Sequence, residues 1–132
     1  MIPPNVALDY LHDATVRSIG FDLAAEERQL RLVLVAHPDC GYEKLNGKRV
    51  TIQIQDVVFM NYVFLGHVIG DEYLSSWDLD LPPARMSEEC RNALLGTADA
   101  IVPFQTHGLA FSSGSELELV GQSFSIEVDD VA

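Results

Sequence analysis

Two adjacent residues near the start of the chain have the types of a catalytic pair. His12 and Asp13 join an imidazole to a carboxylate, and a carboxylate can orient an imidazole that acts as a general base. Successive residues of an extended strand point to opposite faces, so the pair requires a turn in the backbone. The alternative interpretation is structural, with Asp13 bonding to the backbone where the first strand begins.

A second group places potential metal ligands within one tetrapeptide, His37-Pro38-Asp39-Cys40. Zinc binds His nitrogen and Cys sulfur, but a structural zinc site needs four ligands. His12, His67 and His107 are too far away in the sequence to complete the set except through the fold. The competing interpretation is a turn-rich loop that holds a His and a Cys without a metal.

Cys90 is the third candidate, because it falls in the first turn of a predicted helix, where thiolates are stabilised. The neighbouring Glu88 and Glu89 oppose a thiolate, and Cys90 shares a helix face with Ala93 and Leu94. We therefore expect a core residue rather than a nucleophile. The sequence contains neither a glycine-rich phosphate loop nor a G-x-S-x-G motif, and we expect no enzyme activity, no metal and no cofactor.

The segment 71–80 is the candidate binding surface, because it combines aromatic residues with four carboxylates. Aromatic anchors among acidic groups suit a basic protein partner. In the alternative interpretation the aromatic residues belong to the core and the acids form a solvated face. The same ambiguity holds for Phe59, Tyr62 and Phe64. The candidate binding residues are Asp71, Glu72, Tyr73, Trp77, Asp78 and Asp80.

The charge of the chain restricts its partners. Among 132 residues, 20 Asp and Glu face 8 Lys and Arg, so the formal net charge is −12. Nucleic acids would be repelled, whereas a basic protein would be attracted. The longest nearly apolar run, 57–65, is interrupted by Asn61 and is too short to span a bilayer. We expect a cytoplasmic protein whose two cysteines, Cys40 and Cys90, stay reduced.

Alternation of apolar and polar residues predicts the elements that must position these groups. It predicts strands over 15–23, 29–36 and 49–55, the first two forming a hairpin, with a loop over 37–48. The run 57–60 does not alternate and fits either a doubly buried strand or a short buried helix.

The second half of the chain continues this pattern. A short strand is predicted from Trp77 to Leu81, and Ser87 is expected to cap a helix that ends near Gly96. Further strands are predicted around 109–111, 117–119 and 124–128, and Gly121-Gln122 fits a two-residue hairpin turn.

These elements define a fold class. About six or seven strands with one or two helices indicate an α+β fold with a mainly antiparallel sheet. The length indicates one domain, 1–132, with loose ends at 1–6 and 129–132.

Part of the chain resembles a pattern found in small bacterial proteins. The pattern opens a strand meander with an L-H-D-A motif and places a hydrophobic-x-D-V segment after the third strand. Over roughly residues 8–60 it is carried by Leu11-His12-Asp13-Ala14, then Val16, Ile19, Phe21 and 30–34, then Ile54-Gln55-Asp56-Val57. The families that share it include uncharacterised ones and immunity proteins of polymorphic toxin systems. The resemblance implies an antiparallel α+β fold and, on the immunity branch, neutralisation of a toxin by direct binding.

Three functions follow as hypotheses. The first is a non-enzymatic acidic protein-binding domain, of which an immunity protein that neutralises a basic toxin is the sharpest form. The second is a structural or self-assembling module that forms a homodimer. The third is a metal protein or enzyme that uses His12, His37, Asp39, Cys40 or His107.

Overall fold

The computed structural model describes residues 4–22, 24, 28–64 and 71–129. Within these residues the chain forms eight strands, two α-helices and one short 3-10 helix, η1. Their order is α1 (Pro4–Leu8), β1 (Thr15–Asp22), β2 (Gln29–Val35), β3 (Arg49–Gln55), β4 (Phe59–Val63), β5 (Leu74–Leu79), η1 (Pro83–Arg85), α2 (Glu88–Leu95), β6 (Gln105–Phe111), β7 (Glu116–Gly121) and β8 (Ser123–Asp129).

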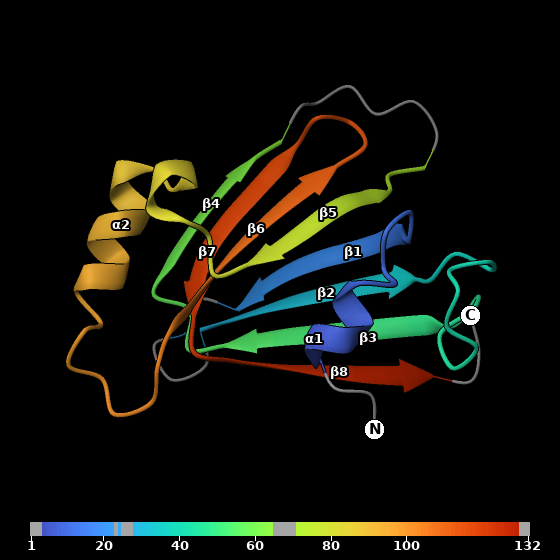
Figure 1. The fold of residues 1–132 in the computed structure, drawn as a ribbon, viewed down its shortest axis with the longest axis horizontal. Helices are drawn as coiled ribbons and strands as arrows, with labels where there is room; N and C mark the ends of the chain where they lie inside the picture. The colour runs from blue at the N-terminus through green and yellow to red at the C-terminus, as the bar shows by residue number, and fades with distance from the viewer. Residues whose placement is uncertain (1–3, 23, 25–27, 65–70, 130–132) are drawn as a thin grey trace.

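The strands form two antiparallel sheets of four strands each. One sheet has the order β1-β2-β3-β8 and the other the order β4-β7-β6-β5, as Figure 1 shows. The α+β class with mainly antiparallel strands is therefore confirmed. The run 57–60, which periodicity left open, belongs in part to strand β4. Strand β5 begins at Leu74, three residues before the predicted start.

Two stretches of chain pass from one sheet into the other. Strand β3 pairs with β8 in the first sheet, and its continuation β4 pairs with β7 in the second. The corner is tied by two backbone hydrogen bonds, from the Gln122 N–H to the Gln55 oxygen (2.9 Å) and from the Val58 N–H to the Val120 oxygen (3.0 Å).

The predicted hairpin turn at Gly121-Gln122 is wrong. Strands β7 and β8 follow each other directly but do not pair, because β7 lies between β4 and β6 whereas β8 pairs with β3. Gly121 is needed for another reason: a Cβ there would lie 2.5 Å from the Cγ2 atom of Ile54. The glycine allows the two bent strands to approach closely.

The sheets also meet along their other sides, where β1 lies beside β5 (Figure 1). The N–H of Leu74 donates to the oxygen of Ala14 and the N–H of Asp13 to the oxygen of Leu74, both at 2.9 Å. The N–H of Val16 donates to the oxygen of Glu72 at 2.8 Å. The two sheets are thus joined on both sides and enclose one core.

The core follows the predicted alternation. The alternate apolar residues of β2 and β3 are buried, and they meet buried residues of the opposite sheet such as Leu109, Leu117 and Leu119. Helix α1 adds Ala7 and Leu8 to the same core. The buried residues of β2 and β3 are Leu30, Leu32, Leu34, Val50, Ile52 and Ile54. Residues 4–6 begin helix α1 and Asp129 ends β8, whereas the rest of the predicted loose ends, 1–3 and 130–132, lies outside the described residues.

Helix α2 packs against β7 and β4 on the outer face of the second sheet. It begins after Ser87, as predicted, because the Ser87 side chain accepts a hydrogen bond from the Cys90 N–H at 3.1 Å. Gly96 is the C-cap but keeps a right-handed φ of −63°. No helix among the described residues is both long and apolar enough to cross a membrane.

Candidate functional site

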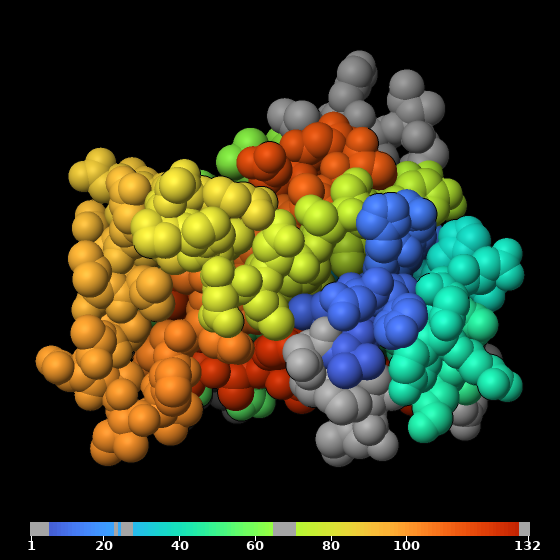
Figure 2. All heavy atoms as spheres, in the orientation of Figure 1, coloured from blue at the N-terminus to red at the C-terminus, as the bar shows by residue number. Residues whose placement is uncertain are grey.

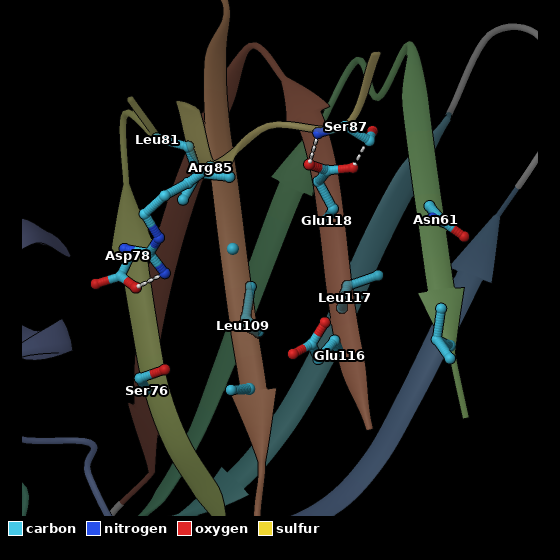
Figure 3. A pocket seen from close by; sticks show the side chains of 13 residues that line it. Asn61, Ser76, Asp78, Leu81, Arg85, Ser87, Leu109, Glu116, Leu117 and Glu118 are labelled. Carbon is cyan, nitrogen blue, oxygen red and sulfur yellow. Dashed lines mark hydrogen bonds and ion pairs between the residues drawn. The ribbon is translucent and has the colours of Figure 1, made fainter. Parts of the chain in front are cut away.

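The outer face of the second sheet carries a groove of about 410 Å³ beside helix α2. Figure 3 shows its lining side chains on the strands β5, β6, β7 and β4. Its floor is formed by small residues of β5 and β6, and its rim by carboxylates. We call it the acidic groove and define it by Ser76, Asp78, Gly108, Ala110, Glu116 and Glu118.

Strand register explains how the groove forms. Residue Asp78 lies opposite Gly108, and Gly108 lies opposite Glu118, so these three form one row across neighbouring strands. The next row holds Ser76, Ala110 and Glu116 in the same way. Neighbouring strands lie about 4.8 Å apart, so Asp78 and Glu118 stand on strands about 10 Å apart, with Gly108 between them. The small residues of β6 thus create the hollow.

Two of the three carboxylates of the groove are held by neighbours. The Arg85 guanidinium contacts Asp78, with Nη2 and Oδ2 3.0 Å apart. Glu118 accepts hydrogen bonds from the Ser87 N–H (2.9 Å) and from the Ser87 hydroxyl (2.6 Å), as drawn in Figure 3. The Glu116 side chain is exposed and makes no hydrogen bond or ion pair with the described residues. With one guanidinium among three carboxylates, the groove stays negative.

The groove also has an apolar part. Val63 of β4 and Leu81 line it together with the carboxylates. The Leu81 side chain lies over Gly108, where an added Cβ would come within 2.9 Å of its Cδ2 atom. A cavity with apolar walls and a few converging acids can hold a long basic side chain, because the stem packs on the walls while the head reaches a carboxylate.

The structure separates the six predicted binding residues. Asp78 lies in the acidic groove, but Trp77 points the other way, into the molecule, because neighbouring strand residues face opposite sides. Glu72 accepts hydrogen bonds from the Ser112 hydroxyl and the Ser113 N–H, both at 2.8 Å. Asp71, Tyr73 and Asp80 are exposed outside the groove.

Glu116 and Glu118 were not among the predicted site residues. The signal that could have found them was present, since acids at alternate positions of β7 face the same side as the small residues Gly108 and Ala110 of β6. Sequence alone does not tell which strand lies beside which, so the match between acids and small residues became visible only with the pairing.

The candidate dyad His12–Asp13 does form. The backbone turns at Asp13, which has a φ of 65°, and brings the Asp13 Oδ2 within 3.0 Å of the His12 Nδ1. Both side chains are exposed, at 67% and 63% of their full area. The contact joins the two side chains and lies at the surface.

The loop that holds His37 and Cys40 is organised by internal hydrogen bonds. The Asp39 N–H donates to the His37 Nδ1 at 3.0 Å, and the Cys40 thiol donates to the Asn46 Oδ1 at 2.9 Å. No group of three or more His, Cys, Asp or Glu side chains in the described ranges could hold a metal ion. His67 lies outside the described residues.

The remaining candidates, Cys90 and His107, are buried. Burial, with the charge and hydrogen bond of Glu118, raises the pKa of the Cys90 thiol to about 11, which opposes a nucleophilic role. The prediction that Cys90 is a core residue is confirmed. Burial lowers the pKa of His107 to about 4. Its Nδ1 accepts a hydrogen bond from the Trp77 Nε1 at 3.0 Å, so the ring is neutral at pH 7.

No protein-family model, curated protein or solved structure matches this chain.

Proposed function

We propose that this chain is a non-enzymatic protein-binding domain whose acidic groove receives a basic segment of a partner protein. In its sharpest form, suggested by the L-H-D-A resemblance, the domain is an immunity protein that neutralises a basic toxin by direct binding. The observation that carries the proposal is the set of three carboxylates around a floor of small residues, Asp78, Glu116 and Glu118.

The charges of the groove and of the whole chain act in the same direction. A net charge of −12 attracts a basic partner from a distance and raises the rate of encounter. At contact, Glu116 is the carboxylate that a Lys or Arg of the partner would meet first, because it is exposed and has no described partner. Asp78 and Glu118 are held in place by Arg85 and Ser87, so little side-chain freedom is lost there on binding.

The test begins with affinity capture of basic proteins at low salt. The affinity of the recovered partner is then measured for the wild-type chain and for two charge-reversal variants. Glu116→Lys changes the groove, whereas Glu127→Lys changes an exposed acid on β8 of the other sheet. Both variants alter the net charge equally, so long-range attraction stays matched. We expect Glu116→Lys to weaken binding at least tenfold and Glu127→Lys to change it less than about threefold.

Affinity should also fall as salt rises from 50 to 300 mM, because the attraction is screened. Equal effects of the two reversals, or an affinity that does not depend on salt, would contradict the proposal. Binding that is lost only when an acid outside the groove is reversed would move the site elsewhere.

A further inference from the structure

Strand β4 lies at an edge of its sheet. It pairs with β7 on one side, and no described strand pairs with it on the other (Figure 1, top). An edge strand presents unpaired N–H and C=O groups that can pair with a further strand. Proteins commonly protect such edges with charges, prolines or bulges.

The two sheet edges at β4 and β8 differ in this protection. Strand β8 carries Glu127 and Asp129 at exposed positions. The stretch 57–64 around β4 holds no charged residue and no proline. Three of its apolar side chains are exposed, Val58 at 46%, Val63 at 50% and Phe64 at 58%. In a chain of net charge −12, an equally charged molecule meets less repulsion at this uncharged edge than at the β8 edge.

An apolar hollow of about 320 Å³ adjoins the start of β4. It lies between the first hairpin and β4, with Phe21 and Leu30 on one side and Val57, Val58 and Met60 on the other, while Asp22, Arg28 and Gln29 supply its polar part. A side chain from a strand added along β4 would therefore find an apolar site at this end.

The residues along the edge are complementary to themselves. Read from 58 to 64, the sequence is Val-Phe-Met-Asn-Tyr-Val-Phe, so around Asn61 each Val has a Phe at the mirror position and Met60 has Tyr62. Antiparallel pairing about a two-fold axis brings such mirror positions opposite each other on the same face. Pairs of aromatic and β-branched residues across strands are favourable.

We propose that β4 pairs with β4 of a second copy of this chain, antiparallel and about a two-fold axis at Asn61. The partner's Phe64 then lies opposite Val58, beside the apolar hollow, and the partner's Val63 lies opposite Phe59. The two Asn61 amides face each other, and each can both donate and accept a hydrogen bond. The product is a sheet that runs through both copies.

The interface is small, since a five-residue strand is only about 17 Å long. We therefore expect a reversible dimer that forms in the micromolar range rather than a permanent one. Sedimentation of the wild-type chain from 1 to 300 μM should show a monomer–dimer equilibrium. A monomer throughout this range would overturn the proposal.

A cysteine placed on the axis tests the register. In Asn61→Cys the two introduced cysteines lie directly opposite each other, with their Cα atoms about 5 Å apart, which is within the range of a disulfide. Val63→Cys places them about 14 Å apart along the strands, and Ser125→Cys places a thiol on the exposed face of β8. Under mild oxidation we expect cross-linked dimer from Asn61→Cys at least tenfold faster than from either control. Equal rates would overturn the register and with it the proposal.

Charge pairing provides a second test that leaves the acidic groove unchanged. Phe64→Glu should abolish the dimer, because it places an unpaired acid opposite Val58 of the partner. Adding Val58→Lys should restore association at least fivefold, since each introduced lysine then faces an introduced glutamate. Val102→Lys, a similarly exposed position outside β4, is the control and should leave the equilibrium unchanged. A dimer that survives Phe64→Glu would contradict the pairing.

Discussion

At the scale of single residues, the buried ring of His107 couples the core to pH. It accepts the Trp77 hydrogen bond and meets the Phe124 ring edge-on, with ring centroids 5.4 Å apart. No charged group among the described residues compensates it, and burial lowers its pKa from 6.5 to about 4. Between these pH values the unfolded chain binds a proton that the folded chain does not, so folding is opposed as pH falls.

We expect the free energy of unfolding to be unaffected by His107 above pH 6.5 and to decline progressively as the pH falls toward 4. The His107 contribution lost over this window is about 3 kcal/mol, at 1.36 kcal/mol per pKa unit. Urea unfolding followed through Trp77, the single tryptophan, measures it. His107→Phe removes the titrating group, so its stability should depend less on pH between 6.5 and 5 than that of the wild type. An unchanged slope would show that other groups cause the loss.

At the scale of elements, helix α2 depends on one serine. Ser87 caps the helix through the Cys90 N–H and binds Glu118 of β7 with both its N–H and its hydroxyl. Ser87→Ala removes the cap and one of the two bonds to Glu118. We expect a loss of about 1–2 kcal/mol in the free energy of unfolding. Ser125→Ala on the exposed face of β8 should change it by less than about 0.5 kcal/mol.

The corner between β7 and β8 depends on a glycine. In Gly121→Ala the new Cβ collides with the Ile54 side chain, so the bent strands must move apart. Overpacking of this kind costs about 1–3 kcal/mol. Gly20→Ala is the matched control, because its nearest atom would be the Arg31 oxygen at 4.0 Å. Thermal unfolding measures the stability lost by each variant. An equal loss in Gly121→Ala and Gly20→Ala would contradict the explanation.

Local patterns predicted the elements better than their pairing. The alternation of Val50, Ile52 and Ile54 predicted both the strand β3 and its buried face correctly, because one buried face leaves a signal of period two. Gly121 misled the sequence interpretation, since a glycine before a polar residue fits a hairpin turn equally well. Whether a chain reverses or passes into another sheet depends on partners far along the chain, which here are Gln55 and Val58, bonded to Gln122 and Val120.

The same limit applies to the acidic groove. The sequence predicts Asp78 and its neighbour Trp77 as parts of one binding surface because they are adjacent, but the two side chains face opposite sides of the sheet. Glu118 stands two strands away from Asp78 across Gly108 and 40 residues later in the chain. A surface made by lateral neighbours in a sheet cannot be found by reading along one strand.

At the scale of the whole molecule, the two sheets should unfold together. Strands β3 and β8 pair in one sheet, the strands next to them along the chain, β4 and β7, pair in the other, and both sheets bury one core, so opening either sheet exposes the core of both. Native-state hydrogen exchange should therefore give the central strands β2 and β6 the same opening free energy, equal to that of global unfolding. A difference of more than about 2 kcal/mol between them would show independent units.

The shared strands also divide the chain into two halves of the same plan. The segment β1-β2-β3-β4 forms two strands and a longer bent strand made of β3 and β4, and the segment β5-β6-β7-β8 does the same with β7 and β8. The first strands of the two halves meet at Ala14 and Leu74, and the two bent strands pair with each other. Each half alone exposes its share of the core and two rows of open hydrogen-bonding groups. A chain severed between β4 and β5 should therefore give two fragments that are disordered apart and regain the native structure by complementation when mixed.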